Sequence, residues 1–295
     1  MIWIIGNQGM LGRELSELCQ TLGVRCVGTD REVSILEPDE LRRYAERVSQ
    51  DGEKLEWIIN CAAYTAVDKA EDEPERCFAL NAKGPQNIGY VAQEIGARVL
   101  HISTDYVFSG EAEKPYREDD PVAPQSVYGK SKLEGERHLL AACPDAVIVR
   151  TAWLYGNYGP NFVATMLKLM NERDTVGVVA DQKGSPTWAR DLASAILAIV
   201  QMPQAVSGIY HFTDEGEITW YDFAQEIYAQ GRRLGLIAHE CNVRPLTTAE
   251  YPTKARRPAY SVLSKEKIKT IFNVQVPEWR ASLAQYLEEE TQKKR

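Results

Sequence analysis

The sequence has 295 residues, of which 44% are apolar and 26% are charged, and its formal net charge at pH 7 is −8. A chain of this length can bury one large core, or one core with a smaller lobe packed on it, and its apolar content excludes disorder as the main state. The negative charge argues against a broad surface for nucleic acids or anionic membranes, because both are polyanions. We therefore expect a globular protein that takes neither as a partner.

Targeting segments and metal motifs are absent from the sequence pattern. The first residues lack the basic start and the cleavage site of a signal peptide, and the apolar run at 192–200 is too short to span a bilayer. The six cysteines form no C-x-x-C pair, and the four histidines never have the spacing of metal ligands. We expect a cytoplasmic protein with reduced thiols and no metal site.

Short β-branched runs alternate with helix-period segments in the first half of the chain. This pattern is typical of a parallel sheet covered by helices on both faces. The predicted strands are 2–5, 24–27, 57–60, 99–102 and 147–150, with a weaker one at 176–179. The predicted helices begin near Gly9, Pro38, Pro74, Tyr128, Asn161, Thr187, Trp220 and Pro277.

The alternation breaks after about residue 155, where connections rich in Pro, Gly and Thr become longer. We predict an α/β protein with a Rossmann-type doubly wound parallel sheet and a smaller C-terminal substrate-binding lobe. Residues 1–155 would bind the dinucleotide and residues 156–295 the substrate. Some segments of the second half would return to complete the first domain.

Three glycines, Gly6, Gly9 and Gly12, lie between the first predicted strand and the first predicted helix. Glycines there permit a tight turn, a close approach to a pyrophosphate and close packing of helix on sheet. Asp30, 18 residues after Gly12, ends the second strand and can accept both hydroxyls of the adenosine ribose. Arg31 could instead pair with a 2′-phosphate, so NADH and NADPH both stay open.

Tyr128 and Lys132 lie four residues apart at the start of a predicted helix. They share one helix face, whereas Lys130 turns toward solvent. A tyrosine has a pKa near 10, and a lysine cation about 5 Å away would lower it by roughly two units. The phenol could then act as a general acid and base, and Lys132 would also reach the nicotinamide ribose.

Ser103 and Thr104 follow the fourth predicted strand, at the end of a parallel sheet where ligands bind. Such hydroxyls can simply satisfy backbone groups at a strand end. Beside the glycine turn and Tyr128, however, Thr104 can donate to a substrate oxygen on which negative charge develops. We predict that Thr104, Tyr128 and Lys132 are the catalytic residues.

With these motifs the sequence resembles the dTDP-4-dehydrorhamnose reductase family of the extended short-chain dehydrogenases/reductases. The resemblance implies hydride transfer from NADPH or NADH to the C4 ketone of dTDP-6-deoxy-L-lyxo-4-hexulose, which gives dTDP-L-rhamnose for polysaccharide biosynthesis. The resembling segments are 6–12, 60–71, 80–82, 103–108, 128–136, 150–156, 181–187 and 257–261.

The resemblance also implies site residues. Thr104, Tyr128 and Lys132 match the catalytic triad, and Asp105 and Trp153 match positions that contact the sugar nucleotide. The expected cofactor contacts, besides Tyr128 and Lys132, are Gly6, Gly9, Met10, Leu11, Gly12, Asp30, Arg31, Ser34, Ile35, Cys61, Ala62, Ala63 and Tyr64.

Other positions either extend the expected site or limit it. Arg257, in a pair of arginines, is a candidate clamp for the substrate diphosphate or an ordinary surface charge. Tyr106 stands where sugar-nucleotide 4,6-dehydratases carry a second acid, so dehydration lacks its base. Some members of the family bind magnesium at a dimer interface through glutamates. Glu14 matches one of these glutamates but Arg190 replaces another, so we expect no metal and only a possible homodimer.

Two alternatives remain. One is a non-catalytic regulatory subunit resembling the methionine adenosyltransferase beta subunit. The other is a reductase or epimerase of another nucleotide sugar, because the choice of base and sugar depends on loops.

Overall fold

The computed structural model describes residues 1–50 and 52–293. The strands are β1 (Ile2–Ile5), β2 (Cys26–Thr29), β3 (Trp57–Asn60), β4 (Arg98–Thr104), β5 (Val147–Thr151), β6 (Leu154–Tyr155), β7 (Thr175–Val179), β8 (Lys183–Gly184), β9 (Thr187–Trp188), β10 (Gly208–His211), β11 (Ile218–Thr219) and β12 (Asn242–Leu246). The α-helices are α1 (Met10–Thr21), α2 (Pro38–Val48), α3 (Val67–Ala70), α4 (Pro74–Phe78), α5 (Gly84–Ile95), α6 (Val127–Ala142), α7 (Phe162–Glu172), α8 (Ala189–Gln201), α9 (Trp220–Arg233), α10 (Glu266–Phe272) and α11 (Trp279–Lys293). A π-helical turn, Ala79–Lys83, and two 3₁₀ turns, Asp105–Val107 and Thr248–Glu250, complete the elements.

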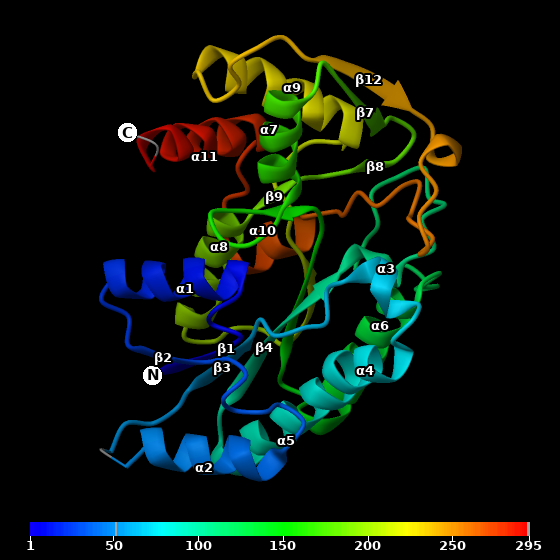
Figure 1. Ribbon diagram of the computed structural model, residues 1–295. Coiled ribbons are helices and arrows are strands. Elements are labelled where there is room, and N and C mark those ends of the chain that lie inside the picture. The colour runs from blue at the N-terminus through cyan, green and yellow to red at the C-terminus, as the bar shows by residue number, and fades with distance from the viewer. Residues whose placement is uncertain (51, 294–295) are drawn as a thin grey trace.

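A parallel sheet forms the centre of the molecule, with strand order β10-β5-β4-β3-β1-β2 (Figure 1). The chain order changes direction between β1 and β3. Open α/β sheets bind their ligands outside the carboxyl ends of the strands at such a switch point. The predicted doubly wound parallel sheet is therefore confirmed.

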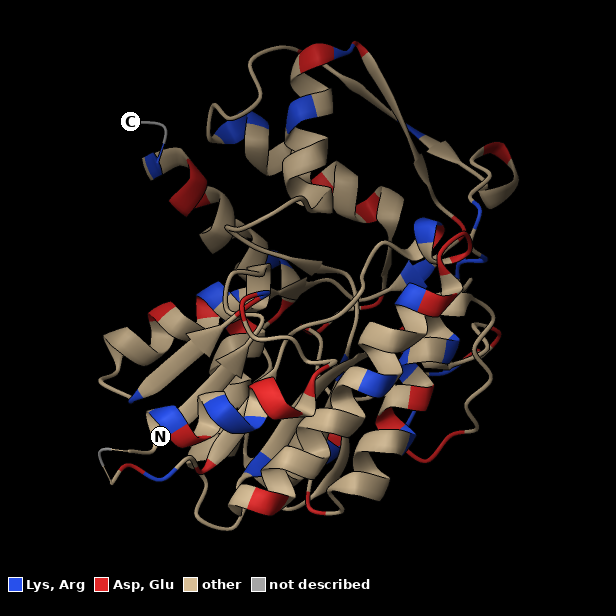
Figure 2. Cartoon of the chain, turned by 60° about the horizontal axis from the view of Figure 1, so that its bottom comes forward, with Lys and Arg blue, Asp and Glu red and all other residues tan. Residues whose placement is uncertain are grey.

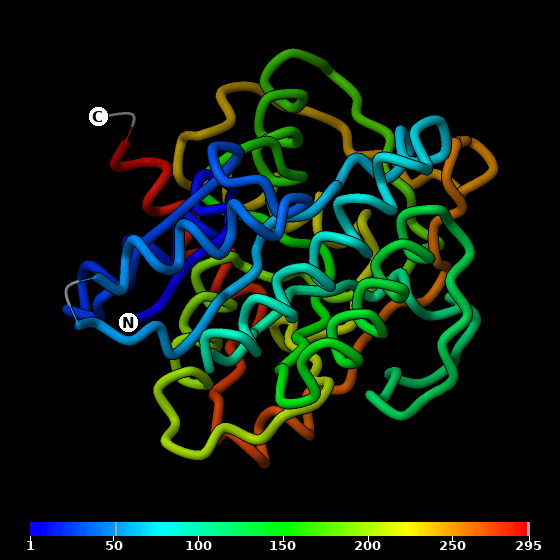
Figure 3. The backbone as a smooth tube through the Cα atoms, turned by 90° about the horizontal axis from the view of Figure 1, so that it is seen from below, coloured from blue at the N-terminus to red at the C-terminus, as the bar shows by residue number. Residues whose placement is uncertain are grey.

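Both faces of this sheet are buried, and the side chains of β1 alternate between them. Ile2 and Ile4 belong to an apolar cluster with residues of α1, α8 and α10, whereas Trp3 and Ile5 belong to one with residues of α2, α5 and α6. A strand covered on both sides is apolar at every position, which explains the unbroken run of β1. Helices α5 and α6 run side by side on the second face (Figures 1 and 3).

The second half of the chain builds a smaller group of elements above the sheet. Helices α7, α9 and α11 share an apolar cluster with the β7–β12 pair (Figure 1). Other parts of this half complete the sheet, because β10 pairs with β5 and α8 packs on α1. The carboxyl ends of the sheet strands therefore face the smaller group.

Most predicted strands lie where the sequence placed them, and 2–5 and 57–60 coincide with β1 and β3. The strand predicted at 24–27 is wrong by two residues, because β2 begins at Cys26. Gly23 at φ 67° and the N–H of Val24, which donates to the Cys19 carbonyl, still belong to the turn after α1. The helices α3, α5 and α10 and the strands β6, β8, β9, β10, β11 and β12 were not predicted.

Charged residues of both signs are intermixed along the helices (Figure 2). Across residues 1–50 and 52–293, no helix combines the length and the apolar character that crossing a membrane requires.

Candidate active site

The turn between β1 and α1, residues 6–12, is built by close approach of backbone to backbone. Gly6 has φ 81°, and a Cβ there would lie 2.8 Å from the backbone nitrogen of Ala62. A Cβ on Gly12 would lie 2.2 Å from the Gly6 carbonyl oxygen. Helix α1 begins without a side-chain cap and without an acidic residue in its first turn, so its first N–H groups suit an anion. The turn fits the pyrophosphate of a dinucleotide.

The other predicted cofactor contacts near β1, α1 and β2 differ in how exposed their side chains are. Asp30 directly follows β2 and is half-buried, and Arg31 is exposed. The side chain of Leu11 is buried in the core, so only its backbone can meet a ligand. Met10 lies against Gly156, which links the turn to the second half of the chain.

Two predicted cofactor contacts in the loop after β2, Ser34 and Ile35, pack or hydrogen-bond within the protein. Ser34 accepts the Leu36 N–H through its hydroxyl, and Ile35 is buried. A Cβ on Gly84 would lie 2.5 Å from Ile35 Cδ1, so a larger residue there would make the Ile35 side chain shift.

The loop after β3 brings its predicted residues to the same edge. Ala62 lies against Gly6, and Ala63 is half-buried beside it. The thiol of Cys61 faces Lys132, and burial raises its pKa to about 12. The N–H of Tyr64 donates to Asn81 Oδ1 at 2.7 Å, and Asn81 Nδ2 donates to the Tyr64 carbonyl.

Helix α6 carries Tyr128 and Lys132, and it is anchored at several points. The Ser126 hydroxyl caps its start by accepting the Gly129 N–H. Lys130 is exposed, as the spacing predicted. Arg150 of β5 forms a two-pronged ion pair with Glu136, at 2.9 and 2.7 Å, and both side chains are buried. This pair fixes the helix against the sheet.

Thr104, at the end of β4, lies close enough to Tyr128 for its hydroxyl to lower the tyrosine pKa. The Thr104 hydroxyl also donates to Asp105 Oδ1 at 2.9 Å. One hydroxyl carries one hydrogen, so it cannot donate to both partners at once. Burial raises the pKa of Asp105 to about 6, although hydrogen bonds from Ser261 and Thr104 oppose the rise. Protonation of Asp105 would release the Thr104 hydrogen toward Tyr128.

The predicted lowering of the Tyr128 pKa by Lys132 is wrong. Burial raises the pKa of Tyr128 well above its ordinary value, and Asp105 and Tyr106 add to the rise. Lys132 instead directs its Nζ to the sheet, where it donates to the Ile102 carbonyl at 2.6 Å and lies 3.2 Å from His101 Nε2. Spacing along a helix fixed the shared face but not the direction of a long side chain.

Trp153 has φ 47°, a left-handed conformation that is uncommon for residues other than glycine. Its indole stacks on Trp220 with ring centroids 3.5 Å apart, and a Cβ on Gly184 would lie 2.5 Å from Trp153 Cε2. The pair offers a flat apolar wall.

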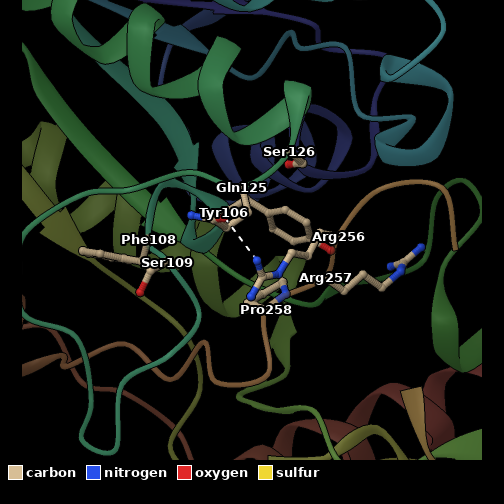
Figure 4. A pocket seen from close by; sticks show the side chains of 8 residues that line it. All are labelled: Tyr106, Phe108, Ser109, Gln125, Ser126, Arg256, Arg257 and Pro258. Atoms are coloured by element: carbon tan, nitrogen blue, oxygen red, sulfur yellow. Dashed lines mark hydrogen bonds between the residues drawn. The ribbon is translucent and has the colours of Figure 1, made fainter. Parts of the chain in front are cut away.

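Residues 254–261, here called the strap, bring Arg257 to the first half of the chain. Arg257 Nη2 donates to Asp68 Oδ2 at 2.9 Å, and the other oxygen of Asp68 accepts the Ala255 N–H at 3.0 Å. Arg257 lines the same pocket as Tyr106, whose ring meets Tyr128 edge-on with centroids 5.5 Å apart. Figure 4 shows Tyr106, Arg256 and Arg257 lining one pocket.

The charges near the start of α1 form a compact group. Arg190 of α8 pairs with Glu14 of α1 at 3.2 Å and also with Glu289 of α11. The guanidinium thus joins three helices. Among the described residues, no group of three or more His, Cys, Asp and Glu could hold a metal ion.

Several residues of the site were missed as individual candidates. Asp68, Asn81 and Ser261 lie inside the segments that resemble the reductase family. That resemblance was the one sequence signal that could have identified them. Asn60 and His101 are paired in the register of β3 and β4, and polar residues near the ends of adjacent buried strands are the pattern that could have indicated them. Trp220 had no signal of this kind.

Comparison with known proteins agrees with this geometry. The sequence model of the family described as "RmlD substrate binding domain" matches residues 1–292. A dTDP-4-dehydrorhamnose reductase of Aggregatibacter actinomycetemcomitans is 42% identical over 286 residues, which cover 95% of this chain and 96% of the relative. A probable dTDP-4,6-dihydroxy-2-methyloxan-3-one 4-ketoreductase of Streptomyces antibioticus is also 42% identical, over 96% of this chain and 93% of its own length.

A solved structure is similar in both sequence and fold. The dTDP-4-dehydrorhamnose reductase of Bacillus anthracis in complex with NADP has a TM-score of 0.90 and 34% identity, with 98% of each chain covered. The family match spans almost all of the chain, and the relatives match it over nearly their full length. The chain therefore belongs to the RmlD family, that of the dTDP-4-dehydrorhamnose reductases.

Proposed function

We propose that this protein reduces the C4 ketone of dTDP-6-deoxy-L-lyxo-4-hexulose to give dTDP-L-rhamnose, with NADPH or NADH as the reductant. One observation carries the proposal. In a chain of this family, Tyr128 lies close to Thr104 at the carboxyl end of β4 and one helical turn from Lys132. The family membership supports the reaction, and this group of side chains supports its chemistry.

The bound nicotinamide supplies the hydride. Tyr128 supplies the proton, and burial keeps its phenol protonated at neutral pH and so ready to donate to the reduced oxygen. Thr104 donates a hydrogen bond to the same oxygen as negative charge develops there. Lys132 lies one helical turn from Tyr128, and its Nζ beside the sheet suits a contact with the cofactor ribose.

We assign the cofactor to the first domain, residues 1–155, and the sugar nucleotide to residues 156–295, with Asp105 shared between them. Gly6 and Gly12 would admit the pyrophosphate, and Asp30 would take the adenosine ribose. Trp153 would support the deoxysugar face, a role that its stacking on Trp220 favours. Arg257 would meet the diphosphate, although in the structure its charge is paired with Asp68.

A second candidate keeps the reaction and changes the sugar. The Streptomyces antibioticus relative acts, by its name, on a different dTDP-linked ketone, yet it is as similar to this chain as the rhamnose enzyme. A 4-ketoreductase of another dTDP sugar is therefore the alternative. Comparison of kcat/KM on the two ketones decides between them.

The test is the oxidation of NADPH or NADH, followed by absorbance with the 4-keto-6-deoxy-L-lyxo nucleotide sugar. We expect turnover by the wild type and a loss of at least roughly 100-fold in kcat for Tyr128→Phe, because only the proton donor is removed. Cofactor affinity should stay within about twofold, a change below 1 kcal/mol. Tyr251→Phe, at an exposed tyrosine, is the control. Cofactor binding without turnover on any 4-keto sugar nucleotide would support the regulatory-subunit alternative instead.

We further propose a cytoplasmic location, which the free state of all six cysteines supports. A homodimer is a separate proposal. Light scattering on the eluting protein, with and without Mg²⁺, tests the oligomeric state and its dependence on metal.

A further inference from the structure

A row of buried polar groups leads from the loop after β3 to the lysine of α6. The Ala62 N–H lies 3.0 Å from Asn60 Oδ1, and Asn60 Nδ2 lies 3.0 Å from His101 Nδ1. His101 Nε2 lies 3.2 Å from Lys132 Nζ. The exposed fractions of Asn60, His101 and Lys132 are 1%, 0% and 2%, so water does not substitute for any of these partners.

The direction of each hydrogen bond in this row follows from its first member. A backbone N–H can only donate, so the group of Asn60 that faces Ala62 must be its oxygen. The amide nitrogen of Asn60 then faces His101 Nδ1, and an amide nitrogen also can only donate. Nδ1 is therefore the acceptor and carries no hydrogen.

The remaining nitrogen of His101 must hold the proton of the ring. Burial and the neighbouring Lys132 keep the pKa of His101 well below its ordinary value, so the ring is neutral at physiological pH. A neutral imidazole has one N–H, and with Nδ1 as acceptor that N–H lies on Nε2. The N–H points at Lys132 Nζ.

We propose that His101 is a positioning residue that presents an N–H to Lys132 and so favours the neutral amine of this lysine. The amine can accept from Nε2–H with its lone pair while it donates to the Ile102 carbonyl. An ammonium has no lone pair and would place its own N–H against that of His101. The inference rests on the proposed function for its meaning, because Lys132 is there the residue that would contact the cofactor ribose.

The surroundings of Lys132 act in both directions. Burial lowers its pKa to about 8, whereas Glu136 on the same helix, Cys77 of α4 and Cys61 after β3 each raise it. The N–H of His101 adds to the lowering. Protonation of Lys132 then requires His101 to change tautomer and to give up its bond from Asn60. The positive charge of Lys132 is therefore lost at a lower pH than an isolated lysine would allow.

The tautomer can be measured directly by ¹⁵N NMR of protein labelled at its four histidines. We expect a signal with the Nε2–H pattern above about pH 9, where the amine of Lys132 is neutral, that disappears in His101→Gln and gives way to the Nδ1–H pattern as the pH falls through the Lys132 pKa of about 8. An Nδ1–H pattern, or an average of the two, above about pH 9 would overturn the proposal. This readout needs no turnover, so it stands even if the proposed reaction proves wrong.

Two substitutions of His101 test whether the direction of its hydrogen bonds, rather than its packing, sets the pKa of Lys132. In His101→Gln, the side-chain oxygen can accept from Asn60 and the side-chain nitrogen can donate to Lys132, so the fall of kcat/KM at high pH should keep its midpoint. In His101→Glu the carboxylate accepts from both neighbours, and the midpoint should rise by roughly one unit or more. Equal midpoints in the two variants would contradict the proposal.

A substitution of Asn60, at the other end of the row, tests the proposal even if His101→Glu does not fold. In Asn60→Asp, a carboxylate accepts from Ala62 and from His101, so the ring should turn to its Nδ1–H form without any substitution at His101 or Lys132. The ¹⁵N pattern reports this directly. An unchanged Nε2–H form in that variant would show that the row does not set the tautomer.

Discussion

Polar groups meet the candidate site from two sides, and they are held in different ways. On the sheet side, which we call the floor, Gly12, Asn60, His101 and Lys132 are packed against backbone or joined by buried hydrogen bonds. On the strap side, Arg257 and Asp68 are 30% and 45% exposed. Exposed ion pairs contribute about 0 to 1 kcal/mol, whereas unpaired buried charges cost several. The floor should therefore determine stability and chemistry, and the strap should determine access.

The largest effect is expected from Gly12→Ala, which adds a methyl group at the closest backbone contact of the floor. The new Cβ would lie 2.2 Å from the Gly6 oxygen and 2.7 Å from the Asn7 Cα, both backbone atoms that cannot turn aside. We expect a loss of roughly 3 kcal/mol or more in the free energy of unfolding, together with loss of cofactor binding. Urea unfolding and fluorescence titration with NADPH measure the two effects.

Gly9→Ala is the matched control in the same turn. Its Cβ would meet only one atom, the Gly6 oxygen at 3.3 Å, and Gly9 has φ −74°, which alanine adopts. Stability should therefore change by less than about 1 kcal/mol. A Gly12→Ala protein as stable as this control would show that the turn is not closely packed.

The next effect is smaller and depends on pH, because it comes from the buried Lys132. Its pKa is about 8 in the folded protein, against an ordinary value of 10.5. Between these two values the folded protein binds fewer protons than the unfolded chain, so the contribution of this group to stability rises with pH. Relative to Lys132→Met, the wild type should gain up to about 3 kcal/mol between pH 8 and 10.5.

Parallel urea unfolding of the two proteins at several pH values measures this difference. Groups remote from Lys132 titrate alike in both proteins, so the difference comes from Lys132 and from the neighbours that its charge affects, Cys61, Cys77 and His101. If the difference in the free energy of unfolding stayed constant between pH 8 and 10.5, Lys132 would keep its ordinary pKa in the folded protein. The floor would then affect stability no more than the strap does.

The sequence was most informative about the floor. The glycines, the strand ends and the pair Tyr128 and Lys132 follow local rules of turn geometry and helix periodicity, so their positions were predictable. The sign of the Tyr128 pKa shift was not, because it depends on burial and on where the lysine Nζ lies, and both are set by His101 and Ile102 of a neighbouring strand.

The contacts of the strap could not be predicted from the sequence. Asp68 and Arg257 are 189 positions apart, and no periodicity connects them. The resemblance marked both segments without saying that they meet. Trp153 illustrates the same limit, because its left-handed backbone depends on Trp220 and Gly184 in two other segments.

The smallest effect is expected from Asp68→Asn, which weakens the strap. The asparagine can still accept the Ala255 N–H, but the ion pair with Arg257 is lost, so stability should fall by less than about 1 kcal/mol. Arg257 would no longer be held beside Tyr106, and we expect KM for the sugar nucleotide to rise roughly fivefold, as loss of about 1 kcal/mol of binding implies. The loss should shrink at high salt, where exposed charges are screened.

Asp72→Asn controls for the general loss of a carboxylate near the strap. Asp72 pairs with Lys254 in an exposed ion pair, whereas Arg257 pairs with Asp68, so KM should stay unchanged. Equal KM increases in the two variants would mean that the strap responds to overall charge. An increase confined to Asp68→Asn, with kcat and stability retained, would mean that one half-exposed carboxylate shapes the entrance without taking part in the chemistry of the floor.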